Sequence, residues 1–263
     1  MTTHVRIVSP ITADRSAKWR RLLTLAGPGV RLSVAQIAAG PASIESEFED
    51  ALAVPATIAK VIEAEREGAD AVVIDCLCDP GLRPCREVAS IPVLGPAQAA
   101  MGLAAMFGQR FGVVTVVPGL GPTFENLAAL YGFAGRLASV RAVDIPVLEL
   151  ERDPERTRRA LVAEAAAAVE RDRAHAIVFG CSGMFGMAAA VIAGLAERGH
   201  PGVPVIDPLP AAVELAVAAA RLGLSQSRLS YPRPPRGKPL AGYGFLPALA
   251  EVAGEPAAAD ASP

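Results

Sequence analysis

The sequence predicts an α/β fold of two pseudo-symmetric lobes, each a parallel-rich sheet flanked by helices. Short apolar runs rich in Val and Ile alternate with helix-length segments, a pattern typical of parallel sheets with right-handed crossovers. One pattern also occurs twice: residues 71–76 and 176–181 are each an apolar run that ends in cysteine. A helical stretch follows each copy, and then a second apolar run ends in proline, at 91–96 and at 203–208.

Local sequence patterns predict the position of each strand and helix along the chain. Strands are expected where β-branched residues cluster between Gly and Pro, and helices where capping residues precede longer segments. In order, we expect strand 5–9, helix 17–26, strand 30–37, helix 55–68, strand 71–74, a helix from 79, strand 91–94, helix 98–107, strand 112–116, helix 123–131, strand 137–143, helix 154–173, strand 176–179, helix 184–198, strand 203–206 and helix 208–222.

Several helix starts carry recognisable residues. Asp-Pro pairs at Asp79 and Asp153 place an N-cap residue before a proline in the first turn. Pro55 is expected to open its helix for the same reason. Cys76 should then lie just ahead of a helix N-terminus, whose positive end would lower a thiol pKa.

The chain order gives an expected domain organisation. Residues 1–98 and 209–242 should form the first lobe, because the apolar helix after Pro208 is expected to return and pack there. Residues 99–208 should form the second lobe, and residues 243–263 a C-terminal tail, disordered from residue 255.

Composition limits the classes of function. The chain has 263 residues, 52% of them hydrophobic, and a formal net charge of −2, which gives no reason to expect nucleic acid or a membrane surface as a partner. The longest apolar run, 99–108, is too short to span a bilayer. No signal peptide is apparent, so the four cysteines indicate reduced thiols in the cytoplasm. A small molecule is the expected partner.

Cys76 and Cys181 are the main candidate functional residues. They lie at the carboxyl ends of equivalent strands, where ligands bind in open α/β sheets. If the lobes face each other, the two thiols face each other across the cleft. A thiol, with a reference pKa near 8.5, is a suitable proton carrier. The alternatives are that each cysteine is a small buried hydrophobe, or that the pair forms a disulfide.

Hydroxyl groups are expected near the same cleft. Ser9 and Thr115 end equivalent strands, while Ser43 and Ser182 lie in loops on the same side. Cys78 is a candidate for the pocket wall through its closeness in sequence to Cys76. Each of these residues could bind polar substrate atoms, although Ser182 would also serve as a helix cap.

Other chemistries lack their usual patterns. The cysteine spacing does not match common zinc sites, and the three histidines do not cluster. None of the three lysines follows a strand, which argues against a pyridoxal Schiff base. There is no Gly-rich phosphate-binding fingerprint. No metal and no cofactor are therefore expected.

Five stretches of the chain carry a resemblance to a known family. They include Cys-x-x-Asp-Pro-Gly-Leu after the first strand-end cysteine and Gly-Cys-Ser-Gly-Met around the second. On these motifs the chain resembles the aspartate/glutamate racemase superfamily and, within it, the hydantoin and allantoin racemases. The stretches are 40–46, 68–82, 86–87, 91–95 and 176–184, and residues 231–242 also look like the family's tail.

The resemblance implies a cofactor-independent racemase, with its active site in the cleft between the lobes. Cys76 and Cys181 match the family's two catalytic cysteines: one thiolate removes the proton from the stereocentre and the other thiol protonates the opposite face. A hydantoin or allantoin is the expected substrate, because its acidic carbon lies next to a carbonyl. Homo-oligomers are usual in the family.

Some positions depart from the family pattern. Ser9-Pro10-Ile11-Thr12 stands where the family usually has Asn-Pro-Asn-Thr, so two amides expected to contact substrate are missing. Leu77 stands where Phe is frequent, and Gln98 where Glu is common. The implied pocket, with Leu77 on its wall, is therefore altered, and a substrate other than a simple 5-substituted hydantoin is plausible.

Three alternatives remain open at the level of sequence. An arylmalonate decarboxylase-like enzyme would keep only one of the two cysteines, which argues against it. A maleate isomerase-like cis-trans isomerase would keep both, so the cysteines do not separate it from a racemase. The third alternative is a non-catalytic small-molecule binding protein with two lobes.

Overall fold

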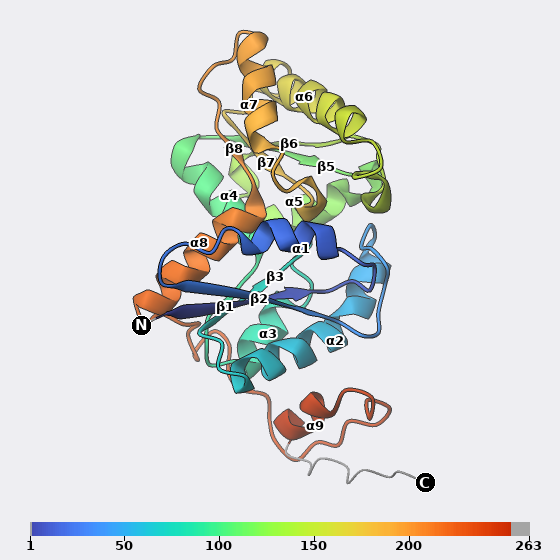
Figure 1. Cartoon of the computed structure of the whole chain (residues 1–263), viewed down its shortest axis with the longest axis vertical. Coiled ribbons are helices and arrows are strands. Elements are labelled where there is room, and N and C mark those ends of the chain that lie inside the picture. Colours follow the sequence, from blue (N-terminus) through green and yellow to red (C-terminus); the bar gives the residue numbers. More distant parts are fainter. Residues whose placement is uncertain (1, 254–263) are drawn as a thin grey trace.

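Two parallel four-stranded sheets form the framework of the protein. The computed structural model describes residues 2–253. In the first sheet the strand order is β2-β1-β3-β4, and in the second it is β6-β5-β7-β8 (Figure 1). The strands are β1 (Thr3–Ser9), β2 (Val30–Gln36), β3 (Ala71–Ile74), β4 (Val93–Leu94), β5 (Phe111–Thr115), β6 (Leu137–Ala142), β7 (Ala176–Phe179) and β8 (Val205–Ile206).

The two sheets repeat each other in topology and in register. In each lobe the first strand pairs in parallel with the next two strands along the chain. The Asp75 N–H donates to the Val8 carbonyl at 2.7 Å, and the Gly180 N–H donates to the Val114 carbonyl at the same distance. Asp75 and Gly180 are therefore equivalent positions. The duplicated two-lobe α/β fold predicted from sequence is confirmed.

Helices cover both sheets and connect the lobes. They are α1 (Ser16–Leu23), α2 (Glu47–Arg66), α3 (Leu82–Val88), α4 (Pro96–Phe107), α5 (Gly121–Leu130), α6 (Pro154–Glu170), α7 (Ala188–Glu197), α8 (Pro208–Arg221) and α9 (Pro247–Ala253). Helix α8 follows the last strand of the second sheet. It packs on β1 and β3 of the first sheet, as expected from its apolar sequence. It also contacts α4, so these two helices join the lobes side by side.

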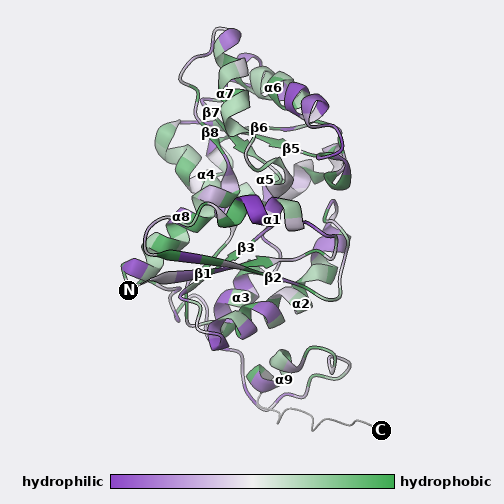
Figure 2. Cartoon of the chain, in the orientation of Figure 1, coloured by the Kyte–Doolittle hydropathy of each residue, from purple (hydrophilic) through white to green (hydrophobic). Residues whose placement is uncertain are grey.

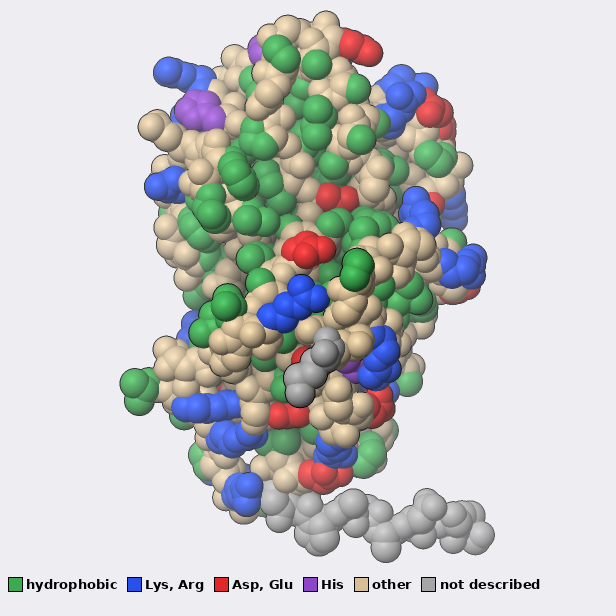
Figure 3. Space-filling model, turned by 60° about the vertical axis from the view of Figure 1, so that its left-hand side comes forward, with side chains coloured by type: hydrophobic (Ala, Val, Ile, Leu, Met, Phe, Trp, Pro, Cys, Tyr) green, Lys and Arg blue, Asp and Glu red, His purple; other side chains and the backbone are tan. Residues whose placement is uncertain are grey.

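The hydrophobic core is continuous between the lobes. Ile44, Ala53 and Leu77 of the first lobe belong to the same buried cluster as Phe111 and Phe179 of the second. Outer helices are amphipathic: Figure 2 shows hydrophilic and hydrophobic stretches along the α6 ribbon. Figure 3 shows hydrophobic side chains gathered over the upper half of one face, which is the second lobe. No described helix has the length and apolarity needed to cross a membrane.

Helix α2 begins eight residues before the expected start at Pro55. The Ser46 side chain accepts a hydrogen bond from the Glu49 N–H, and the Glu49 carboxylate accepts one from the Glu45 N–H at 2.7 Å. This arrangement resembles a capping box, with the N–H of the residue before the cap in place of the cap's own N–H, and it starts the helix at Glu47. Pro55 then lies inside the helix, so the expectation that it opens the helix is wrong.

The expected helix start at Asp79 is also wrong. Asp79 has a positive φ of 51°, which a helix does not accept, and α3 begins only at Leu82 after Gly81 in the left-handed conformation. The Asp79 carboxylate instead accepts hydrogen bonds from the N–H groups of Ala97 (3.0 Å) and Gln98 (3.1 Å). It therefore caps α4, a helix that is distant in sequence.

Two further boundaries differ from expectation. Ser182 to Met184 form a short 3₁₀ turn, and α7 begins at Ala188 rather than at Met184. The C-terminal segment contains α9, which packs on α2, within the range expected to be a tail. The prediction of disorder from residue 255 lies outside the described residues. The lobe boundaries predicted at 98/99 and 208/209 remain a prediction.

Candidate active site

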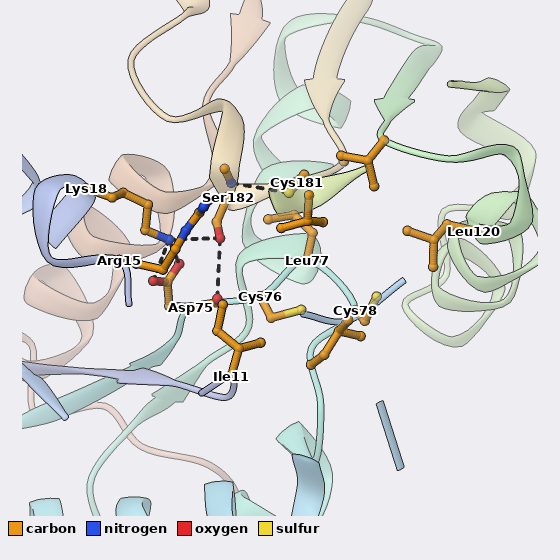
Figure 4. A pocket seen from close by; sticks show the side chains of 15 residues that line it. Ile11, Arg15, Lys18, Asp75, Cys76, Leu77, Cys78, Leu120, Cys181 and Ser182 are labelled. Carbon is orange, nitrogen blue, oxygen red and sulfur yellow. Dashed lines mark hydrogen bonds and ion pairs between the residues drawn. The ribbon is translucent and has the colours of Figure 1, made fainter. Parts of the chain in front are cut away.

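A pocket lies between the two lobes, at the carboxyl ends of the strands (Figure 4). Its volume is about 30 Å³, room for about two water molecules. Residues of both lobes line it: Ile11, Arg15, Lys18, Ile44, Asp75, Cys76, Leu77, Cys78, Val116, Leu120, Val147, Gly180, Cys181, Ser182 and Gly183.

The duplicated strands deliver one cysteine each to this pocket. Cys76 follows β3 by two residues, and Cys181 follows β7 by two residues. Both thiols are free and partly exposed. Gly180 allows the close approach of β5 and β7 before Cys181, because a Cβ there would lie 2.6 Å from the Thr115 Cβ. The fold thus brings together the two cysteines that the repeat singled out.

Both thiols have raised pKa values. A hydrogen bond with the Cys78 side chain, together with burial, raises the pKa of Cys76 well above its ordinary value. Burial raises the pKa of Cys181 to about 11. The Gly183 N–H, 3.3 Å from the Cys181 sulfur, and the charges of Lys18 and Arg15 act in the opposite direction. The expected lowering of the Cys76 pKa by a following helix is wrong, because α3 starts six residues further on.

A buried ion pair forms one wall of the pocket. The Lys18 ammonium lies 2.6 Å from one Asp75 oxygen and donates to the other at 2.8 Å. It also donates to the Ser182 hydroxyl at 3.2 Å, which joins the two lobes. The exposed fractions of the Lys18 and Asp75 side chains are 3% and 1%. This network fixes Ser182, the residue after Cys181, relative to Asp75, the residue before Cys76.

Sequence reasoning missed Arg15, Lys18 and Asp75. Arg15 and Lys18 belong to the start of α1, a segment that carries no motif and does not follow a strand end. One signal was present: Lys18 is one of three lysines in a chain whose Lys and Arg together number 25. A second signal was Asp75, a charged residue at the position that Gly180 occupies in the second copy of the repeat.

The remaining expected site residues divide into two groups. Leu77, Cys78 and Ser182 line the pocket. Ser9, Ser43 and Thr115 are not among its lining residues. Their role in substrate binding stays a prediction.

The second group has other contacts in this structure. The Thr115 hydroxyl is buried and donates to the Gly180 carbonyl at 3.3 Å. The Ser43 hydroxyl donates to Glu45 at 3.4 Å, and the Ser9 carbonyl accepts from the Ile37 N–H. These contacts hold the strand ends and loops that surround the pocket.

The described residues contain no cluster of candidate metal ligands. Among them, no group of three or more His, Cys, Asp or Glu side chains is arranged to hold one. Cys85 is fully buried in α3, and burial raises its pKa, which fits a core residue. His4 is a buried residue of β1, and its Nε2 lies 2.6 Å from the hydroxyl of Ser33 on the neighbouring β2.

Comparison with known proteins identifies the family of this fold and site. The family model described as Asp/Glu/Hydantoin racemase matches residues 17–216, a range that includes both cysteines. The chain belongs to the Asp/Glu/hydantoin racemase family. It is therefore an isomerase of the racemase type, and the resemblance on the two cysteine motifs is confirmed.

Relatives within this racemase family match most of the chain. The hydantoin racemase of Rhizobium meliloti is 38% identical over 91% of this chain and 98% of its own length. The hydantoin racemase of Pseudomonas sp. (strain NS671) is 41% identical over 77% and 79%. The structure of allantoin racemase from Klebsiella pneumoniae superposes with a TM-score of 0.84, at 30% identity over 93% of this chain and 99% of that one.

Proposed function

We propose that this racemase inverts the acidic carbon of a hydantoin- or allantoin-type ring, with Cys76 and Cys181 as its two bases and without a cofactor. The observation that carries the proposal is that equivalent strands of a duplicated fold each bring one free thiol to the same pocket. The hydantoin and allantoin racemases among the relatives support the substrate class.

The proposed reaction consists of two proton transfers. One cysteine, as thiolate, removes the proton from the ring carbon, and the electron pair left on carbon delocalises into the neighbouring carbonyl. The other cysteine, as thiol, donates its proton to the opposite face and becomes the thiolate. For the other enantiomer the two roles are exchanged. The two thiols and the substrate carbonyl are sufficient for this chemistry, so no cofactor is required.

The environment of the thiols supports a role in proton transfer. Raised pKa values keep a cysteine protonated near neutral pH, which suits the proton donor. Lys18 and Arg15 favour the thiolate of Cys181 electrostatically, which suits the base. The Gly183 N–H donates to the same sulfur and further stabilises its negative charge.

Serine variants test the two-base scheme. We expect Cys76→Ser and Cys181→Ser each to lower hydantoin racemisation by about a thousandfold, because a hydroxyl is a far weaker acid than a thiol. In deuterium oxide, each single variant should still exchange the ring proton of one enantiomer. Circular dichroism measures racemisation and NMR measures exchange.

Cys85→Ala is the matched control, since Cys85 is buried in α3 away from the pocket and its loss should leave activity intact. Dialysis of the wild-type enzyme against a chelator should also change nothing. Full racemisation by either serine variant would overturn the two-base scheme.

We also propose that the enzyme works in the cytoplasm as a homo-oligomer. Four free thiols fit a reducing compartment. Met106 and Phe107 at the end of α4 are 75% and 69% exposed, which favours contact with another subunit. Sedimentation velocity measures the assembly.

A further inference from the structure

Arg15 is a buried cation on the pocket wall whose hydrogen-bonding capacity is not used. Its side chain is 6% exposed. Among the described residues, its Nε is buried without any hydrogen-bond partner. Its ion-pair partner Glu151 lies 3.6 Å from Nη1, which is beyond hydrogen-bonding distance. Because a guanidinium stays charged, these donors need an acceptor that the described part of the chain does not supply.

Among the described residues, Arg15 has no carboxylate partner of its own. Lys18 and Asp75 neutralise each other within the pocket wall. Glu151 is shared with Arg21, whose Nη2 lies 3.2 Å from it, and its side chain is 34% exposed. Arg15 therefore has only a shared and partly exposed carboxylate as its partner, and an anion in the pocket would complete its pairing.

Arg15 also lies close to the reacting groups. A Cβ at Gly183 would lie 3.1 Å from Arg15 Nη2 and 3.3 Å from the Cys181 sulfur. The guanidinium and this sulfur thus border the same residue. A group bound by Arg15 would be attached close to the carbon that Cys181 deprotonates or protonates.

The pocket is polar at one end and apolar at the other. In Figure 4, Arg15, Lys18 and Asp75 lie on one side of the two cysteines and Leu120 lies on the other. Further apolar side chains line the pocket: Ile11, Ile44, Leu77, Val116 and Val147. Ile11, which stands where an amide was expected, lies beside Asp75 and Cys76 in Figure 4, so the pocket offers few partners to neutral polar groups.

We propose that the substrate carries a carboxylate on the substituent of its stereocentre and that Arg15 binds this carboxylate. The proposal rests on the proposed function, of which it names the substrate class: hydantoins with an anionic side chain. Arginine suits this role because its planar donors match both oxygens of a carboxylate. Arg15 is then a specificity-determining residue, and the cysteines perform the same proton transfers as before.

Acid and amide substrates of nearly the same shape test this proposal. We expect the wild-type enzyme to racemise hydantoin-5-acetic acid or hydantoin-5-propionic acid with a kcat/KM about 10- to 100-fold above that of the matching primary amide. Arg15→Gln should remove most of this preference through a higher KM for the acid; because Arg15 also favours the Cys181 thiolate, any fall in kcat should be the same for the acid and for the amide. Arg15→Lys should retain part of it.

Arg20→Gln is the matched control. Arg20 lies on the same helix but is exposed, so its charge should not matter. Equal kcat/KM values for acid and amide in the wild-type enzyme would overturn the proposal. So would an Arg15→Gln variant in which the acid-to-amide ratio of kcat/KM stays at the wild-type value, since that result shows that Arg15 does not bind the carboxylate. If Arg15→Gln does not fold, the acid-to-amide ratio of kcat/KM in the wild-type enzyme and in Arg15→Lys tests the proposal instead.

A separate measurement distinguishes failure of this proposal from failure of the proposed function. If no hydantoin, charged or neutral, exchanges its ring proton in deuterium oxide, the proposed function fails. Calorimetric binding of the acid and of the amide still tests Arg15 in that case. Tighter binding of the acid that is lost in Arg15→Gln supports the carboxylate site, and equal binding rejects it.

Discussion

At the scale of single residues, opposing influences act on the sulfur of Cys181, one of the two proposed bases. Burial raises its pKa, while the Gly183 N–H and the charges of Lys18 and Arg15 lower it. Burial dominates, and the resulting pKa is about 11. The thiol form therefore predominates at neutral pH, and the thiolate is a minor species.

This balance predicts a pH profile for racemisation. Because the pKa of Cys181 is raised, the thiolate fraction grows about tenfold for each pH unit below about 11. We expect kcat/KM to rise from about pH 7 to about pH 9 without reaching a plateau, after subtraction of the uncatalysed rate. Initial rates measured by circular dichroism check this. A profile that falls above about pH 8 would show that another group controls activity.

The cysteine pair could be found from sequence, and the cations beside it could not. Each cysteine ends a short apolar run, and this local pattern is repeated, so position and chemistry were both visible. Arg15 and Lys18 reach the pocket because α1 packs between the two lobes, which is a tertiary arrangement. Nothing in their local sequence separates them from the solvated arginines next to them.

At the scale of elements, the start of α4 depends on a side chain from another segment. Gly95 and Pro96 begin the helix, and the Asp79 carboxylate accepts hydrogen bonds from two of its first N–H groups. The Tyr131 hydroxyl of the second lobe donates to the same carboxylate at 2.7 Å. A Cβ at position 95 would lie 2.4 Å from the Asp79 carboxyl carbon, so glycine is required there.

Removal of the Asp79 carboxylate should lower the free energy of unfolding more than removal of a helix cap that makes only local contacts. We expect Asp79→Ala to lower the free energy of unfolding by about 2–4 kcal/mol, because it takes an acceptor from two backbone N–H groups and from a largely buried hydroxyl. Asp153→Ala, which removes the exposed cap of α6, should cost only about 1 kcal/mol. Urea unfolding measures both. Equal losses would mean that the contacts of Asp79 contribute nothing beyond a local cap.

Asp79 also shows why helix boundaries were harder to predict than helices. The Asp-Pro pair at 153 caps α6 as expected, since the Asp153 side chain accepts from the Arg156 N–H. The identical pair at 79 does not begin a helix, because its aspartate is engaged by α4 and Tyr131. Local propensity is the same at the two sites, and the tertiary contacts differ.

At the scale of the whole molecule, the lobes are joined by both polar and apolar contacts. The Val147 N–H of the second lobe donates to the Glu45 carboxylate of the first at 2.8 Å. Lys18 bonds Ser182 across the same boundary, and one buried cluster includes residues of both lobes. The two-lobe order followed from the repeat, but these connections depend on loops that carry no periodic signal.

Such coupling predicts that the lobes unfold together. Trp19, the single tryptophan, lies on α1 of the first lobe, so its fluorescence reports there. Far-UV circular dichroism reports on the helices of both lobes. We expect both signals to follow one urea transition with the same midpoint. Separate midpoints would show that each lobe is stable without the other.

The small volume of the pocket has a consequence for turnover. A cavity of about 30 Å³ is smaller than the roughly 150 Å³ of a cavity that holds a benzene ring, and the hydrogen bond between Glu45 and Val147, a lining residue, joins the two lobes at the pocket. If the substrate is the proposed hydantoin-type ring, its binding requires the lobes to move apart around this bond. In the closed form, the two sulfurs and not bulk water would then be the proton carriers next to its stereocentre.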